Sequence, residues 1–169
     1  WLMIDKLPLN LLKAPLINQA FPNAKFILAV RHPLDCVLSC WMQSFKLNAS
    51  MANMVDLDRI VDFYCVAMKI FKLSQKRYGL NIYKVRYEDL IEGFEAETNG
   101  ILRFLGLAWE PALVNYQTTA AARERIQTPS HSQVIKPIFK TASYRWKHYE
   151  KHLKKYKSQL TPWFEEYGY

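Results

Sequence analysis

The sequence is poor in cysteine and glycine, and it contains no long hydrophobic run. Three cysteines in 169 residues are too few, and odd in number, for a disulfide framework, which favours a reducing compartment and predicts a cytoplasmic location. The longest apolar stretches, such as Phe26 to Val30, are far shorter than the roughly 20 residues of a membrane-spanning helix, so no span is expected. None of the five glycines stands in a phosphate-cradling pattern.

The composition is that of a globular protein. Half of the residues are hydrophobic and 22% are charged, which excludes disordered and low-complexity chains. The length is that of one domain, and we expect residues 1–169 to form a single domain. The chain begins at Trp1 rather than at a methionine, and Leu2 to Ile4 resemble the end of a buried strand. We therefore expect it to be the later part of a longer protein.

Positive charge is concentrated near the C-terminus. The net charge is +8, and Lys140 to Lys157 contains seven Lys or Arg residues against one Glu. Such a surplus favours anionic partners, which include a phosphorylated cofactor, nucleic acid and an acidic surface. Trp146, Tyr149, Leu153 and Tyr156 recur in this stretch at helical spacing, so it predicts a basic amphipathic helix packed on the domain.

Strand and helix patterns alternate over the first 110 residues. Lys25 to Arg31 and Asn81 to Tyr87 are typical of strands. Helices are predicted from Pro33 to about Phe45, from Asp56 to Tyr78, and around Ile101 to Leu105. This alternation predicts an α/β fold with a parallel sheet, and such sheets bind ligands at the carboxyl ends of their strands.

Arg31 follows the first predicted strand and Tyr87 ends the second, so both should lie at the ligand-binding edge. Ser39 stands about two turns into the helix that begins at Pro33, and we expect it to face back toward the strand end. A guanidinium and a hydroxyl placed in this way can converge on one phosphate, which the helix N-terminus also attracts. The pattern also allows a surface arginine and a helix serine with no shared task.

Four groups of residues occur in an order and spacing that one protein family shares. They are Lys25-Phe26-Ile27 with Arg31-His32-Pro33, Asp35 and Ser39; Val85-Arg86-Tyr87-Glu88-Asp89-Leu90; Phe104-Leu105-Gly106-Leu107 with Trp109-Glu110-Pro111; and Gln133-Val134-Ile135-Lys136-Pro137 with Arg145-Trp146. Through these residues the chain resembles sulfotransferases that use 3′-phosphoadenosine 5′-phosphosulfate (PAPS), in particular the bacterial branch often found with tetratricopeptide repeats and the tyrosylprotein sulfotransferases. The resemblance is to the C-terminal part of that domain.

The resemblance implies a role for each matching residue. Arg31 and Ser39 correspond to the ligands of the 3′-phosphate, and Tyr87 corresponds to the residue that contacts adenine. Lys6 corresponds to a lysine near the transferring sulfonate, which makes it the candidate catalytic residue of this chain. The alternative role of Lys6 is that of a surface lysine after a strand.

Three further residues match the cofactor segment that follows. Thr128 and Ser130 fall in a polar loop that approaches the cofactor in the family, and their alternative is a solvated turn. Lys136 corresponds to a cofactor-binding lysine, and its alternative is an ordinary exposed lysine.

The resemblance also implies a fold and a reaction. The fold is a three-layer α/β domain with a parallel sheet of the P-loop nucleotide-kinase-like type, here lacking its N-terminal strand and P-loop. The reaction transfers a sulfonate from PAPS to an acceptor hydroxyl or amine, leaves 3′,5′-ADP, and needs no metal. The catalytic base should then lie before Trp1. Neither the acceptor nor the oligomeric state follows from the sequence.

Two other classes of function stay open. A phosphotransferase of similar fold would carry Mg²⁺-binding acidic residues and prefer ATP. A non-catalytic basic module would bind anions or nucleic acid with steep salt dependence, but a charged helix is usually a solvated face, so we expect no nucleic-acid partner. His148 and His152 are four apart without further ligands to complete a metal site, and His32 is interpreted as structural.

Overall fold

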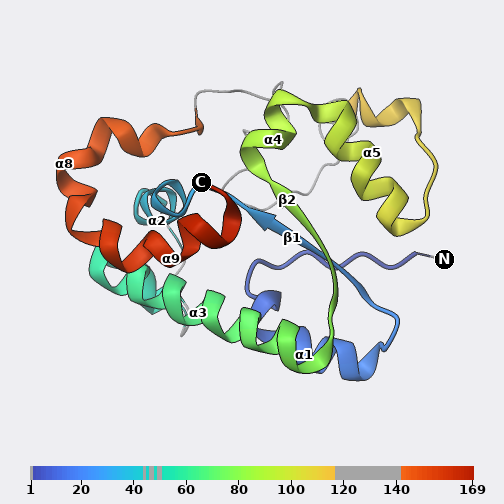
Figure 1. Ribbon diagram of the computed structural model, residues 1–169, viewed down its shortest axis with the longest axis horizontal. Coiled ribbons are helices and arrows are strands. Elements are labelled where there is room, and N and C mark those ends of the chain that lie inside the picture. The colour runs from blue at the N-terminus through green and yellow to red at the C-terminus, as the bar shows by residue number, and fades with distance from the viewer. Residues whose placement is uncertain (1, 44, 46–47, 49–50, 117–141) are drawn as a thin grey trace.

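The computed structural model describes residues 2–43, 45, 48, 51–116 and 142–169 (Figure 1). Its helices and strands in chain order are α1 (Asn10–Ala20), β1 (Lys25–Val30), α2 (Pro33–Trp41), the 3₁₀ helix η1 (Met51–Met54), α3 (Leu57–Tyr78), β2 (Asn81–Arg86), α4 (Tyr87–Glu92), α5 (Phe94–Leu105), η2 (Pro111–Leu113), η4 (Arg145–Tyr149), α8 (Glu150–Leu153), η5 (Lys154–Tyr156) and α9 (Lys157–Tyr167).

The two described strands form a parallel pair, as predicted. Lys25 lies opposite Asn81 and Val30 lies opposite Arg86, so both strands end at the same edge of the sheet. Each strand ends one residue earlier than predicted, and Tyr87 is already the first residue of α4. In Figure 1 the strands run between α1 and α3 on one side and α4 and α5 on the other.

Helix α3 begins and ends close to its predicted limits because both of its ends carry strong local signals. The Asp56 side chain accepts a hydrogen bond of 2.8 Å from the Arg59 N–H, which caps the first turn. Gly79 ends the helix in the left-handed conformation, with φ of 58°. Helix α2 ends at Trp41 instead of near Phe45, and its last turn tightens into a bond from the Gln43 N–H to the Cys40 carbonyl.

Helix α5 packs closely on β2. A Cβ atom at Gly100 would collide with the Tyr83 hydroxyl, so a larger residue here would displace the Tyr83 side chain. The ammonium of Lys25 donates hydrogen bonds to the carbonyls of Phe104 and Leu105 at the end of α5. These contacts fix α5 to the beginning of β1 and to β2.

Three described α-helices, α1, α4 and α9, were not predicted from the sequence. Helix α1 contains Pro15 and helix α9 contains Pro162, and proline weakens a helical prediction. Helix α1 packs against α3, while α9 packs against both α2 and α3. The main core joins α2, α3 and α9, and its fully or nearly fully buried side chains include Leu34, Val37, Ile60, Val61, Leu153 and Leu160.

The N-terminal residues differ from the prediction. Leu2, Met3 and Ile4 are 58%, 76% and 77% exposed and form no strand, so the expected buried strand end is wrong. A strand forms where its backbone groups can pair with a neighbour. Within the described residues, β1 pairs with β2 and no other strand joins the sheet.

The basic C-terminal stretch also differs from the prediction. It is not one helix, because η4, α8, η5 and α9 follow one another as short helical pieces. The predicted apolar side is confirmed, since Leu153 and Tyr156 are buried and Trp146 and Tyr149 pack against the core. No helix in the described part of the chain is long and apolar enough to cross a membrane.

Candidate functional site

Arg31 and Tyr87 meet where the two parallel strands end. Each is the residue that directly follows its strand, and the register places Val30 opposite Arg86. The Arg31 guanidinium lies 5.1 Å from the centre of the Tyr87 ring. Tyr87 is half-buried, and burial raises the pKa of its hydroxyl. The predicted juxtaposition of these two residues is therefore present.

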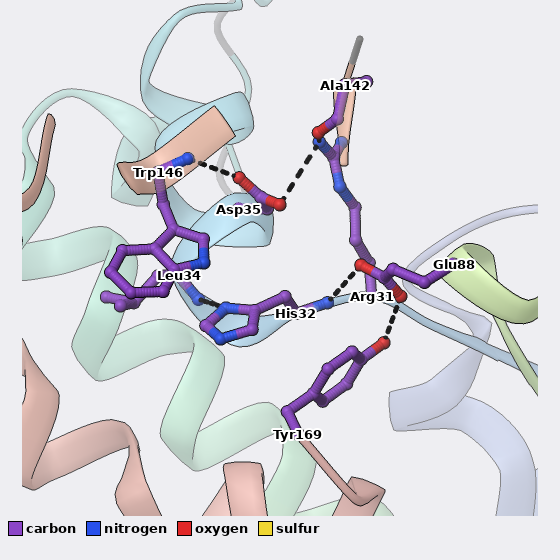
Figure 2. Close-up of polar contacts among 8 residues, drawn as sticks. All are labelled: Arg31, His32, Leu34, Asp35, Glu88, Ala142, Trp146 and Tyr169. Carbon is purple, nitrogen blue, oxygen red and sulfur yellow. Dashed lines mark hydrogen bonds and ion pairs between the residues drawn. The ribbon is translucent and has the colours of Figure 1, made fainter. Parts of the chain in front are cut away.

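The Arg31 side chain is held on two sides but stays partly open, with 23% of it exposed. Its Nη2 atom donates a hydrogen bond to the Ala142 carbonyl and lies 3.9 Å from Asp35 Oδ2 (Figure 2). Its Nε atom is buried and has no hydrogen-bond partner among the described residues. Arg31 is thus oriented by the protein and retains a donor that a ligand can use.

Ser39 shares a small cavity with Arg31. Ser39 is exposed on α2, about two turns after the strand end. The cavity has a volume of about 80 Å³ and is lined by Arg31, Asp35, Leu38, Ser39, Met42, Ala142 and Arg145. The structure therefore brings the predicted guanidinium and hydroxyl to one place.

Two buried carboxylates hold the strand ends, and the sequence analysis assigned neither of them a role. Asp35 is 1% exposed and accepts a hydrogen bond of 2.8 Å from the Trp146 N–H. Glu88 is 2% exposed, and it accepts bonds from the His32 N–H at 3.2 Å and from the Tyr169 hydroxyl at 2.6 Å (Figure 2). Buried carboxylates are tolerated only with such partners, so both anchor the C-terminal segment to the strand ends.

His32 is structural, as interpreted from the sequence. Its Nδ1 atom accepts a hydrogen bond of 3.2 Å from the Leu34 N–H and so caps α2. Its ring centre lies 5.0 Å from that of Trp146, 5.0 Å from that of Phe164 and 5.1 Å from that of Tyr169. Burial lowers the pKa of His32 from 6.5 to about 4. The ring is therefore neutral at pH 7, as a hydrogen-bond acceptor at Nδ1 must be.

A known protein family matches more than half of this chain. The profile of the sulfotransferase family matches residues 1–111, a range that includes Lys6, Arg31, Ser39 and Tyr87. This chain belongs to the sulfotransferase family. Its helices and small parallel sheet are compatible with the α/β fold of that family.

Two of the similar proteins are named as sulfotransferases. Protein-tyrosine sulfotransferase A of Caenorhabditis elegans is 25% identical over 147 residues, which cover 85% of this chain and 38% of that protein. Protein-tyrosine sulfotransferase 2 of Gallus gallus is 24% identical over 154 residues, covering 85% and 40%. An uncharacterized protein of Aquifex aeolicus (strain VF5) is 32% identical over 152 residues, covering 89% and 20%. The chain thus spans between a fifth and two-fifths of the length of these relatives.

Of the other predicted site residues, Lys6 is the one that lies among the described residues. Lys6 lies in the exposed segment before α1 and has no hydrogen bond or ion pair with another described residue. Thr128, Ser130 and Lys136 lie outside the described residues. Within the described part of the chain, no cluster of three or more His, Cys, Asp or Glu side chains is placed to hold a metal ion.

Proposed function

We propose that this sulfotransferase moves a sulfonate group from PAPS to an acceptor hydroxyl or amine, and that the described strand ends hold the 3′-phosphoadenosine half of the donor. Family membership supports sulfonate transfer. The observation that supports PAPS as the donor is the contact between Arg31 and Tyr87 at one edge of the sheet. A single nucleotide needs both a cation for its phosphate and an aromatic surface for its base.

The residues present fit a 3′-phosphate. A phosphate oxygen accepts hydrogen bonds, and Arg31 Nε is a buried donor without a partner among the described residues. Ser39 supplies a hydroxyl on the same cavity. The cavity extends along α2 from Asp35 in its first turn to Met42 at its C-terminal cap. PAPS, when bound, supplies the sulfonate and leaves as 3′,5′-ADP.

Arg31 and Ser39 would act by orienting the donor. A donor held at its 3′-phosphate has fewer orientations to lose before an in-line displacement at its other end. A hydrogen bond to a charged group contributes about 1.5–3 kcal/mol, so Arg31 alone would distinguish a 3′-phosphorylated nucleotide from one without that phosphate by tenfold or more. Lys6 is proposed to stabilise charge on the transferring sulfonate.

Other parts of the proposal rest on the family resemblance. Thr128 or Ser130 would approach the nucleotide, and Lys136 would add a cation to it. The strands β1 and β2 would belong to a larger parallel sheet of the P-loop nucleotide-kinase-like type, with residues 1–169 in a single domain. Two relatives are named protein-tyrosine sulfotransferases, so a tyrosine hydroxyl is one acceptor to test.

A comparison of two sulfonate donors tests this proposal. PAPS and adenosine 5′-phosphosulfate differ only in the 3′-phosphate, and their turnover would be followed with labelled sulfonate and a tyrosine peptide, an oligosaccharide and an amine as acceptors. We expect PAPS to be the better donor, with its advantage lost in Arg31→Ala and kept in Arg77→Ala, which removes an exposed arginine from the end of α3. Equal use of the two donors, or transfer of phosphate from ATP instead, would contradict the proposal.

A further inference from the structure

Helix α3 carries apolar side chains on two opposite faces. One face packs into the core through buried residues such as Val61 and Phe71. On the other face Val66, Ile70 and Leu73 are 56%, 41% and 59% exposed. Residues three or four positions apart are neighbours on a helix surface, so these three form one continuous line, here called the α3 stripe. It is a contiguous apolar surface rather than a set of scattered exposed residues, and such a surface indicates an interaction site.

Charges of opposite sign stand at the two ends of the α3 stripe. Asp62 lies one turn before Val66, Arg77 lies one turn after Leu73, and both charged residues are exposed. Arg77 forms no ion pair with another residue that the structure describes. Asp62 Oδ1 accepts a hydrogen bond of 2.7 Å from Gln159, and a carboxylate has the capacity to accept several more. Both ends of the stripe can therefore pair with a partner of opposite charge.

The stripe and its two charges are arranged symmetrically along the helix. Asp62 and Arg77 are equally far in sequence from the midpoint between positions 69 and 70, and so are Val66 and Leu73. Two copies of α3 that pack antiparallel about a twofold axis at this midpoint place Val66 of each copy opposite Leu73 of the other. The same arrangement places Asp62 of each copy opposite Arg77 of the other. Each contact then occurs twice, as a twofold interface requires.

This charge pattern favours a second copy over other partners. Nucleic acid or another acidic surface would be repelled by Asp62 at one end of the stripe. A helix that binds a lipid surface presents a broad apolar face with a basic polar face, whereas the α3 stripe is narrow and has charges of both signs at its ends. A second copy supplies both the apolar side chains and the opposite charges at the spacing that the stripe needs.

We propose that the α3 stripe is an interface through which two copies of this chain associate, with their α3 helices antiparallel. The interface is independent of the proposed donor site, because none of its residues lines the cavity that holds Arg31 and Ser39. One helix from each copy buries less area than a standard protein interface, and small interfaces are weak and reversible. We therefore expect the dimer to be half formed at about 10–100 µM protein.

Sedimentation velocity at increasing protein concentration tests the interface. We expect wild type to shift from monomer to dimer, and Leu73→Lys to weaken association by about tenfold or more, because it places a charge in the apolar centre. Leu2→Lys is the matched control, since Leu2 is 58% exposed and lies outside α3. This control should leave the dimer dissociation constant within about twofold of wild type. Thermal unfolding should show that both variants are folded, because both leucines are exposed.

Charge reversal tests the antiparallel arrangement. Asp62→Arg alone and Arg77→Asp alone should each weaken association by about tenfold, because two ion pairs become two contacts between like charges. The variant with both substitutions restores opposite charges across the twofold axis, so its dissociation constant should return to within about threefold of wild type. Additive losses in the double variant would contradict the pairing of Asp62 with Arg77.

The remaining outcomes are equally decisive. A wild-type protein that stays monomeric up to about 1 mM, or a dimer that Leu73→Lys does not weaken, would overturn the interface. Monomers that sediment with neutral phosphatidylcholine vesicles in wild type but not in Leu73→Lys would assign the stripe to a lipid surface instead. The ratio of the dissociation constants of 5′-AMP and 3′,5′-ADP should be the same in Leu73→Lys and wild type. Failure of this inference therefore leaves the proposed function standing, and a protein without nucleotide preference leaves the interface standing.

Discussion

The strand ends and the N-terminal segment 2–7 carry two parts of one proposed site, yet their surroundings differ sharply. At the strand ends, Arg31 lies against Tyr87 and the buried Asp35, and Glu88 fixes the adjoining backbone. In segment 2–7, the apolar side chains are exposed and Lys6 has no polar partner among the described residues. Among the described residues, polar contacts therefore fix Arg31, which is proposed for the nucleotide, whereas none involves the Lys6 side chain, which is proposed for the sulfonate.

The two halves of the proposed site therefore obtain their geometry in different ways. A binding group is precise when packing and hydrogen bonds lock the residues behind it. Arg31 has this support from α2, from α4 and from the turn at residues 142–146, and the aromatic rings around His32 add to it. Mutations that remove this support are therefore compared with mutations in segment 2–7.

The largest effect should come from the helix that packs under the strand ends. Leu160 in α9 is fully buried, so Leu160→Ala should cost about 2–5 kcal/mol of unfolding free energy. The same truncation at Leu2, which is 58% exposed, should cost less than about 0.5 kcal/mol. Urea denaturation of both variants measures the difference. Equal losses would contradict the contrast between the two regions.

Removing the Glu88 carboxylate should have the next largest effect. Glu88→Ala leaves the buried His32 N–H and the Tyr169 hydroxyl without their acceptor, which we expect to cost about 3 kcal/mol. Glu92→Ala, an exposed residue at the end of the same helix, is the matched control and should cost less than about 0.5 kcal/mol. Chemical denaturation at pH 7 compares them, and a loss of stability in Glu88→Ala no larger than that in Glu92→Ala would refute the anchoring role.

His32 should make stability depend on pH. Its pKa falls from 6.5 to about 4 on folding because the ring is buried. Between these values the unfolded chain binds a proton that the folded protein does not. The contribution of His32 is therefore complete above pH 6.5, decreases as the pH falls toward 4, and amounts to about 3 kcal/mol.

His32→Asn separates this effect from other titrating groups, since asparagine can still cap α2 but does not titrate. As the pH is lowered from 7 to 4, the unfolding free energy should decrease more steeply for wild type than for the variant. Parallel curves would mean that burial of His32 does not control this pH dependence.

The smallest effect on nucleotide binding is expected at Lys6. Lys6→Ala should leave the affinity for 3′,5′-ADP within about twofold of wild type, because that nucleotide lacks the sulfonate. The same variant should slow transfer from PAPS, which is followed with labelled donor. A loss of 3′,5′-ADP affinity as large as that expected for Arg31→Ala would place Lys6 at the nucleotide instead.

Local signals explain which elements could be predicted from the sequence. Asp56 and Gly79 mark the ends of α3, and the parallel register brings Arg31 to Tyr87 once both strands are recognised. The helices α1 and α9 were missed because each contains a proline.

The anchoring roles of Asp35 and Glu88 could not be predicted because their hydrogen-bond partners are distant in the chain. Asp35 and Trp146 are 111 positions apart, and Glu88 and Tyr169 are 81 apart. An acidic residue four positions after the arginine, in the first turn of the next helix, is a signal that could have suggested the Arg31–Asp35 pair. No such local pattern predicts the hydrogen bond between Glu88 and Tyr169.

The most direct test of the proposed 3′-phosphate site is the ratio of the dissociation constants of 5′-AMP and 3′,5′-ADP, measured by calorimetry on wild type and Arg31→Ala, with thermal unfolding to show that both are folded. We predict a wild-type preference for 3′,5′-ADP of about tenfold or more that disappears in Arg31→Ala. Equal binding of the two nucleotides by folded wild type, or an undiminished preference in Arg31→Ala, would contradict it.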